Sequence, residues 1–312
     1  MAFVIPTEKV VGCLQDLDIQ GAKIGGNDVL PFLQFEGKFP HKPLVAVEVR
    51  DRAPEDWAQP LVDSLSAVWD DPVKWAKFAQ DEMKADMVCL RFDSTHPDRG
   101  DSSPEDAAEL TKKVLAEISV PVMLLGSNHL EKDVEVIKKV ADAAKGRTCI
   151  VGKAQEGNYK TFAATAMAND HYLIALSDLD INLAKQLNIL LTQMGFAKER
   201  ILMDTMSSAL GYGLEYTYSV MERVTLAALR QGDAMMQMPI VNDIGPEAWK
   251  AKEAKAPTEE EPQWGEATKR GILWESVTAT AMLMAGSQLL ILRHPESVNL
   301  VHRTVNSLMG GE

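Results

Sequence analysis

Residues 201 to 244 read ILMDTMSSALGYGLEYTYSVMERVTLAALRQGDAMMQMPIVNDI. A short apolar run ends at Asp204, a polar turn follows, and apolar residues then recur at helical spacing from Glu215 to Arg230. A second apolar run, Ala234 to Val241, ends on an Asn-Asp pair. This order predicts a strand, a turn, a helix and a second strand, with polar groups where each strand ends. In a barrel of alternating strands and helices, that edge is where sites are built.

The same alternation recurs along the rest of the chain. Short runs that are apolar on both faces are typical of parallel strands covered on both sides. Such runs occupy Leu44–Val49, Met87–Phe92, Val120–Leu125, Thr148–Val151, Tyr172–Leu176, Ile201–Met203, Ala234–Val241 and Gln288–Leu292. Helical patterns occupy Asp71–Lys84, Ser103–Ile118, Leu130–Gly146, Tyr159–Ala168, Ile181–Met194, Glu215–Arg230, Trp264–Met284 and Pro295–Leu308.

From Leu44 onward these elements fill 269 residues, 312 minus 43, close to the ~250 residues of a (β/α)8 barrel. We therefore predict an α/β fold, a (β/α)8 TIM barrel at residues 44–312. An open doubly wound sheet would use the same elements, but it usually has a glycine-rich phosphate-binding turn. Gly211-Tyr212-Gly213 does not provide one, because Tyr216 stands where a third glycine is needed.

Two segments fall outside the barrel pattern. Residues 1–43 form a short N-terminal extension, and their scattered glycines indicate a hairpin or cap that closes the bottom of the barrel. Residues 250–263 read KAKEAKAPTEEEPQ, which predicts a solvated, charged loop between strand 7 and helix 7. A docking surface is the alternative reading of that loop.

The composition excludes several classes of protein. The chain has 312 residues, of which 46% are hydrophobic, so it is long enough to bury a full core. A net charge of -13 argues against binding to nucleic acid or to an anionic membrane surface, since both need a basic face. No apolar run approaches the ~18 residues that span a bilayer, and no secretion signal opens the chain. We expect a cytoplasmic protein.

No catalytic or metal-binding set is predicted. Cys13, Cys89 and Cys149 lie far apart, so any iron–sulfur cluster must belong to another chain. The six histidines are single residues without metal-site spacing, and there is no nucleophile elbow or Ser-His-Asp set. His96, in DSTHPDRGD, is interpreted as a residue that hydrogen-bonds within its loop.

Polar side chains nevertheless follow nearly every strand. The candidate binding residues are Asp93, Ser94, Thr95, Asn128, Asp204, Ser207 and Asn242, with Leu210, Gly211 and Tyr212 in the loop after Asp204. Asn128 and Asp178 also fit helix caps. If Asp93, Asp204 and Asp243 converge over an apolar floor, burial would raise their pKa values and one could donate a proton. Hydrogen-bonding support is the alternative role for these carboxylates.

The predicted mouth suits a large polar macrocycle better than acid–base chemistry. Gly211 and Gly213 would let the backbone approach such a ring, while Leu210, Tyr212 and Leu214 would cover its apolar face. A helix-start turn packed on the barrel would use the same residues.

Several long, irregular strings carry a family resemblance. The string SALGYGLEYTYSVMERVTLAALRQGD, with the preceding LMDTMS and the following MPIVNDIG, resembles the small subunit of the corrinoid iron–sulfur protein of anaerobic acetyl-CoA metabolism. A GGND turn at Gly25 to Asp28 and PFLQFEG at Pro31 to Gly37 are similar to the same family. The resemblance spans essentially the whole chain.

The resemblance implies a heterodimer and a division of labour. The large subunit would carry an iron–sulfur cluster and a cobalamin-binding domain, and the barrel of the small subunit would cover the cobalamin. Cobalt would accept a methyl group from methyltetrahydrofolate on a separate methyltransferase and deliver it to acetyl-CoA synthase/CO dehydrogenase. The ten candidate residues would then contact the corrinoid or the partner chain. His96 departs from the cobalt-ligating Asp-x-His-x-x-Gly motif, because it stands three residues after Asp93 instead of two.

Two other functions use the same barrel. A methyltetrahydrofolate-dependent methyltransferase would bind the pterin itself in a pocket lined by the Asp and Asn residues of the rim. A purely structural barrel would hold a complex together and bind neither ligand. Turnover of methyltetrahydrofolate by the isolated chain distinguishes the first of these, and rim substitutions without effect on cofactor retention distinguish the second.

Overall fold

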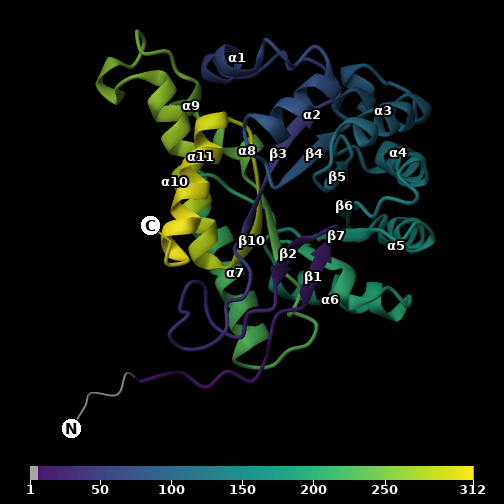
Figure 1. The fold of residues 1–312 in the computed structure, drawn as a ribbon, viewed down its shortest axis with the longest axis vertical. Helices are drawn as coiled ribbons and strands as arrows, with labels where there is room; N and C mark the ends of the chain where they lie inside the picture. Colours follow the sequence, from purple (N-terminus) through teal and green to yellow (C-terminus); the bar gives the residue numbers. More distant parts are fainter. Residues whose placement is uncertain (1–5, 312) are drawn as a thin grey trace.

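The computed structural model describes residues 6–311 of the chain. Within this range, parallel strands close into a barrel in the order β10-β3-β4-β5-β6-β7-β8-β9, and helices surround it (Figure 1). The strands are β3 Leu44–Arg50, β4 Met87–Arg91, β5 Val122–Leu125, β6 Ile150–Ala154, β7 Tyr172–Leu176, β8 Ile201–Asp204, β9 Ile240–Asp243 and β10 Ser287–Leu292. The predicted (β/α)8 barrel is confirmed.

All the predicted helices are present, with small shifts at their ends. They are α2 Pro72–Asp81, α3 Pro104–Glu117, α4 Leu130–Ala143, α5 Tyr159–Ala168, α6 Ile181–Gln193, α7 Leu214–Leu229, α10 Ala267–Ala285 and α11 Pro295–Leu308. Ser103 starts α3 with a capping box that it shares with Asp106. Three short helices were not predicted: α1 Gln59–Leu65, α8 Ile244–Ala248 and α9 Lys252–Lys255.

Side chains alternate between two cores along each strand. Val45 and Val47 of β3 face outward into the core between the sheet and the helices. Leu44 and Ala46 face inward, into a second core inside the barrel. This alternation follows from the two-residue period of a strand. It also decides which later residues of each strand point into the barrel.

An antiparallel hairpin, β1 Asp16–Ile19 and β2 Ala22–Gly25, precedes the barrel (Figure 1). Leu17, Ile19 and Ile24 belong to the core inside the barrel, together with residues at the start of several barrel strands. The Tyr172 hydroxyl donates a hydrogen bond to the Asp18 carbonyl at 2.8 Å. The hairpin therefore lies at the amino-terminal end of the barrel. The division of the chain at residue 43 stays a prediction.

The predicted strand Ala234–Val241 was wrong in its first six residues, since β9 begins only at Ile240. Asp233 forms a turn instead: its carboxylate accepts from the Met235 N–H at 3.1 Å and its carbonyl from the Met236 N–H at 2.9 Å. Met236 and Met238 are buried, so this apolar run fills core space without joining the sheet.

The segment 250–263 is more ordered than a plain charged loop. It contains the one-turn helix α9, and Ala254 and Ala256 within it are buried. The Arg270 guanidinium of α10 donates hydrogen bonds to the Glu253 and Ala256 carbonyls. These contacts hold the segment against α10 near the carboxyl end of the barrel.

Candidate functional site

The inward-facing positions change from apolar to charged at the carboxyl end of the barrel. On β4, Arg91 follows Met87 and Cys89 at two-residue spacing, so it points into the barrel. Glu48 follows Ala46 on β3 in the same way, and its side chain is 0% exposed. The barrel therefore has an apolar lower half and a charged upper half.

Glu48 binds three guanidinium groups. Its carboxylate accepts two hydrogen bonds from Arg293, both at 3.0 Å, and one from Arg50 at 2.8 Å. Arg91 Nε lies 3.5 Å from Glu48 Oε1. Burial would raise the pKa of Glu48, but the three cations outweigh burial and hold that pKa well below its usual value.

A second group of ion pairs joins β4, β6, β8 and β9. Asp243 Oδ2 lies 2.7 Å from Arg91 Nη2 and 2.8 Å from Lys153 Nζ. Lys153 Nζ also lies 2.8 Å from Asp204 Oδ2. Burial acts to raise the pKa of Asp243, but Arg91 and Lys153 prevail and lower it to about 2. For Asp204, burial outweighs Lys153 and raises the pKa.

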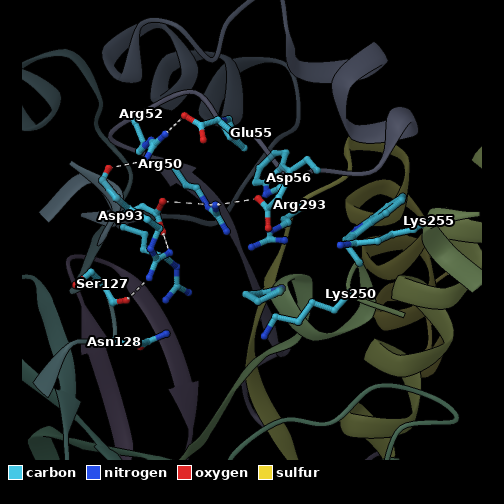
Figure 2. Close-up of a pocket in the computed structure, with 16 residues that line it drawn as sticks. Arg50, Arg52, Glu55, Asp56, Asp93, Ser127, Asn128, Lys250, Lys255 and Arg293 are labelled. Carbon is cyan, nitrogen blue, oxygen red and sulfur yellow. Dashed lines mark hydrogen bonds and ion pairs between the residues drawn. The ribbon is translucent and has the colours of Figure 1, made fainter. Parts of the chain in front are cut away.

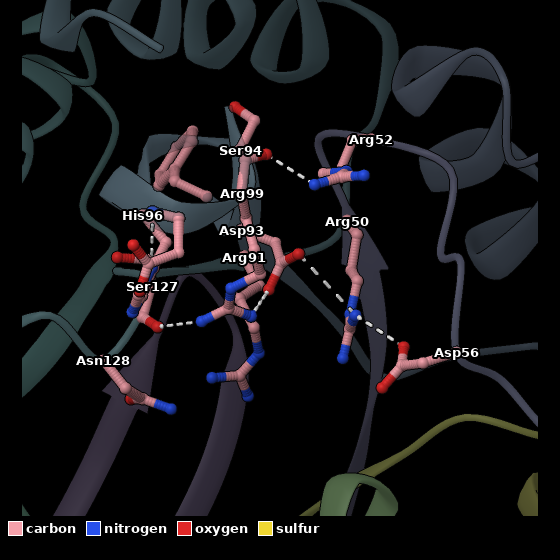
Figure 3. A network of polar contacts seen from close by, with 12 residues as sticks. Arg50, Arg52, Asp56, Arg91, Asp93, Ser94, His96, Arg99, Ser127 and Asn128 are labelled. Atoms are coloured by element: carbon pink, nitrogen blue, oxygen red, sulfur yellow. Dashed lines mark hydrogen bonds and ion pairs between the residues drawn. The ribbon is translucent and has the colours of Figure 1, made fainter. Parts of the chain in front are cut away.

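These contacts correct the expectation of an apolar floor beneath three carboxylates. Asp204 and Asp243 do converge, but on the ammonium group of Lys153. Asp93 lies apart from them, ion-paired with Arg99 and 3.7 Å from Arg50 (Figure 3). Because each of the three carboxylates has a cationic partner, the cluster is a charged support for the mouth.

A cavity of about 370 Å³ opens above this cluster (Figure 2). Seven basic and three acidic side chains line it: Arg50, Arg52, Arg91, Arg99, Lys250, Lys255 and Arg293, with Glu55, Asp56 and Asp93. The guanidinium carbons of Arg50 and Arg293 lie 5.2 and 4.7 Å from the centre of the Trp57 ring. The cavity wall is therefore strongly basic.

Two loops beside the cavity are fixed by hydrogen bonds. Asp51 accepts from the Ser94 N–H at 2.9 Å and from its hydroxyl at 2.5 Å, and burial raises the pKa of Asp51. Arg99 donates to the Ser127 carbonyl at 3.0 Å (Figure 3). Asp133 accepts from the N–H groups of Ser127 and Asn128 at 2.8 and 2.9 Å. These bonds set the positions of Ser94 and Asn128 at the rim.

The loop after β8 is fastened to α9 and α10. Trp274 Nε1 donates to the Leu210 carbonyl at 3.0 Å. The Tyr212 hydroxyl donates to Glu253 at 2.9 Å and accepts from the Lys252 N–H at 2.9 Å. Gly211 has φ +77°, a left-handed conformation that glycine adopts without strain. The loop is fixed, yet Tyr212 remains 50% exposed.

The structure divides the ten predicted binding residues into two groups. The buried ones are Asp93, Thr95, Asp204, Ser207 and Asn242. The partly or fully exposed ones are Ser94, Asn128, Leu210, Gly211 and Tyr212.

The buried residues have partners within the fold. The Thr95 hydroxyl donates to the Phe92 carbonyl at 2.7 Å. Ser207 Oγ accepts from Asn242 Nδ2 at 3.2 Å and from the Asp243 N–H at 3.0 Å. Of the buried group, Asp93 lines the cavity, and Thr95, Asp204, Ser207 and Asn242 do not.

Smaller expectations have mixed outcomes. Asn128 and Asp178 are not helix caps, since His129 caps α4 and Asp180 caps α6. His96 does hydrogen-bond within its loop, because its Nδ1 accepts from the Asp98 N–H at 3.1 Å. Glu48 and Arg91 were missed as site residues, although a charge at an inward position of an apolar strand was a signal that could have revealed them.

Residues 6–311 lack two kinds of feature. No group of three or more His, Cys, Asp or Glu side chains is placed to hold a metal ion. No helix in that range is long and apolar enough to cross a membrane.

The fold and the mouth define a class of protein: a (β/α)8 barrel whose carboxyl end carries buried ion pairs beneath a basic cavity. Solved structures agree on the fold. Dihydropteroate synthase from Xanthomonas albilineans, solved with 4-aminobenzoic acid, superposes with a TM-score of 0.59 over 95% of this chain and 98% of that chain, at 12% identity. At this identity the likeness shows the fold alone.

The chain belongs to the CO dehydrogenase/acetyl-CoA synthase delta subunit family, whose model matches residues 15–301. The acetyl-CoA decarbonylase/synthase complex subunit delta of Methanosarcina mazei is 34% identical over 292 residues, 92% of this chain and 66% of that protein. The subunit delta of Methanothermobacter thermautotrophicus is 36% identical over 279 residues, 89% of this chain and 70% of that protein. The family resemblance seen in the sequence is confirmed. The chain spans about two thirds of the length of these relatives.

Proposed function

We propose that this chain is the barrel subunit of a heterodimeric corrinoid methyl carrier. Its partner would be a large subunit that holds the cobalamin and an iron–sulfur cluster. The methyl group would come from methyltetrahydrofolate through a methyltransferase and leave to acetyl-CoA synthase/CO dehydrogenase. The observation that carries the proposal is a mouth whose carboxylates are neutralised by Arg91, Lys153 and Arg99, in a chain of the delta subunit family.

The residues at the mouth fit the edge and face of a corrinoid. A corrinoid is a wide, flat ring bordered by uncharged amide groups, which need hydrogen-bond donors and acceptors on a broad surface. Ser94 and Asn128 offer such groups at the rim, and Leu210 and Tyr212 offer apolar contact from a fixed loop.

The role of this chain would be to cover the cofactor and exclude water. The bound corrinoid supplies a cobalt ion that accepts and releases the methyl group. Leu210 and Tyr212 would shield one part of the ring from solvent, and Asn128 would orient it through its amide edge. The ion pairs beneath would keep these rim residues in place, since buried charged networks are costly to rearrange.

The alternative, a methyltransferase that binds the pterin itself, has less support. A pterin pocket needs carboxylate and amide groups that are free to bind the ring edge. Here Asp204 and Asp243 are 1% and 8% exposed and bind Lys153, and Asn242 is 0% exposed. The second alternative, a purely structural barrel, does not account for an exposed polar rim above a basic cavity.

The test is co-expression with the large subunit under anoxic conditions, followed by purification and measurement of cobalt, iron and intact mass. We expect a stoichiometric complex with one cobalt per heterodimer. A Tyr212→Ala/Asn128→Ala variant should form the complex but retain cobalamin several-fold less well. Met167→Ala, at the exposed end of α5, is the control and should behave as the unaltered chain. A chain that purifies alone, free of cobalt, and turns over methyltetrahydrofolate would contradict the proposal.

A further inference from the structure

We propose that the basic cavity is a receptor for a phosphate-bearing small molecule with two or more negative charges. This inference goes beyond the proposed function and does not depend on it. The cavity is formed by the ends of β3, β4, β5 and β10 and by the segment around α8 and α9 (Figure 2).

The net charge of the residues that line the cavity is opposite in sign to the net charge of the whole chain. The chain carries a net charge of -13, whereas seven basic and three acidic side chains line the cavity, an excess of four positive charges. Glu48 lies behind the wall and adds one negative charge to the Arg50, Arg91 and Arg293 group. Asp243, Asp204 and Lys153 also lie behind the wall and pair with Arg91 or with one another, which adds one further negative charge, so an excess of two cations remains. A concave, low-dielectric site with such an excess focuses a positive potential that attracts anions.

The cations at the opening are weakly neutralised. Glu55, which pairs with Arg52, has a side chain that is 81% exposed, so water screens that pair strongly. Glu247 pairs with Lys250 at 2.8 Å, also at the surface. Lys255 is exposed and lines the cavity. These side chains can turn toward an anion without breaking a buried contact.

The deeper cations are held ready for binding. Arg50 and Arg293 share the Glu48 carboxylate and both lie over the Trp57 ring, so their guanidinium planes are fixed before any ligand arrives. Arginine presents paired N–H donors that match phosphate oxygens. Fixed donors lower the entropy lost on binding.

The size of the cavity indicates more than an inorganic ion. A volume of about 370 Å³ lies within the range of small-molecule sites. Pro54, Trp57, Pro246 and Trp249 complete the lining, so part of the wall is apolar. The arrangement fits a phosphate group bound by the arginines and an organic portion against Trp57 and Pro246, which are the partly exposed apolar residues of this wall.

The experiment is calorimetric titration of the isolated full chain with inorganic pyrophosphate at low ionic strength. The test variant is Arg52→Gln/Lys255→Gln, which removes two cations from the opening. The matched control is Lys23→Gln/Arg303→Gln, which removes two exposed cations from β2 and α11. We expect saturable binding by the unaltered chain, at least a tenfold weaker Kd for the test variant, and a change below twofold for the control. Absence of saturable binding, or equal weakening by both variants, would overturn the proposal.

Two further measurements separate this proposal from others. Citrate in place of pyrophosphate tests the phosphate assignment, and tighter binding of citrate would overturn it. Cobalamin carries one phosphodiester, so displacement of bound pyrophosphate by cobalamin would overturn the assignment to a separate ligand. Pyrophosphate binding uses no large subunit. If the complex retains no cobalt but the isolated chain binds pyrophosphate, the result counts against the proposed function alone. If the complex retains cobalt but the isolated chain does not bind pyrophosphate, the result counts against this inference alone.

Discussion

Asp243 neutralises two buried cations at once, with Arg91 Nη2 at 2.7 Å and Lys153 Nζ at 2.8 Å from its Oδ2 atom. We predict that Asp243→Asn lowers the free energy of unfolding by ~3–5 kcal/mol, because it leaves buried charge without compensation. Denaturant unfolding followed by circular dichroism measures the loss. Asp56→Asn is the control, since the Asp56 side chain is 78% exposed and should change stability by no more than ~0.5 kcal/mol. Equal effects of the two substitutions would contradict the prediction.

His294 gives the fold a dependence on pH that can be isolated. Burial lowers the pKa of its ring from 6.5 to about 4. The His294 ring therefore binds a proton more tightly in the unfolded chain than in the folded chain. Its contribution to stability is complete above pH ~6.5 and is lost as pH falls toward about 4. His294 also caps α11 through Nδ1, which accepts from the Glu296 N–H at 3.1 Å.

We predict that His294→Asn, which retains a capping side chain, removes this dependence. Between pH 7 and pH 5 the unaltered chain should lose ~2 kcal/mol of unfolding free energy more than the variant does. Urea titrations at both pH values measure the difference. His41→Asn serves as the control, because His41 precedes β3 at the amino-terminal end of the barrel, away from α11, and its side chain is 20% exposed beside Asp16. Parallel loss of stability in the unaltered chain and in His294→Asn would show that the His294 ring is not responsible.

At the scale of elements, the strand predictions succeeded where both faces of a run are apolar, because burial on both faces is what a parallel barrel strand requires. Ala234–Val241 met the same criterion and still failed. Met236 and Met238 are buried, but the turn at Asp233 directs the start of the run away from the sheet, and the run reaches β8 at Pro239, whose carbonyl accepts from the Met203 N–H at 2.9 Å. A run of apolar residues indicates burial, but it does not indicate which backbone N–H and C=O groups form hydrogen bonds within the sheet.

The candidate site was predicted less completely than the fold. Polar residues after the strands were identified, and five of the ten candidates are partly or fully exposed. The charged residues inside the strands, Glu48 and Arg91, were passed over because each strand was treated as a uniform apolar run. Their pairing with Arg293 and Asp243 joins positions about 150 to 250 residues apart, as the separations of 245 and 152 show. Sequence spacing carries no information about such distant pairs.

The hairpin β1–β2 acts as a separate element that closes the lower barrel. Ile19 is 0% exposed within the inner core. We predict that Ile19→Ala lowers the free energy of unfolding by ~2–5 kcal/mol, since it leaves a cavity beneath the strands. Val11→Ala, at a residue that is 72% exposed, should change it by less than ~0.5 kcal/mol. Chemical denaturation measures both, and an Ile19→Ala protein as stable as the unaltered chain would mean that the hairpin does not support the barrel.

Over the whole molecule, the barrel is divided along its axis. The amino-terminal half is apolar and closed by the hairpin, and the carboxyl-terminal half holds the ion pairs and the basic cavity. The two halves therefore have different roles: the apolar core of the amino-terminal half stabilises the fold, and the ion pairs of the carboxyl-terminal half position the rim. An acidic surface around a basic cavity then restricts anion binding to one end of the molecule.

The two ligand proposals predict different responses to salt. Binding of pyrophosphate in the cavity depends on charge, and salt reduces the Debye length from ~30 Å at 0.01 M to ~10 Å at 0.1 M and ~3 Å at 1 M. We expect the Kd for pyrophosphate to rise by roughly tenfold between 50 and 300 mM sodium chloride. Retention of cobalamin by the complex should change by less than about twofold, because the amide edges of a corrinoid are uncharged. Calorimetry on the isolated chain and cobalt content of the complex give the two responses, and parallel loss of both ligands would mean that one electrostatic site serves them together.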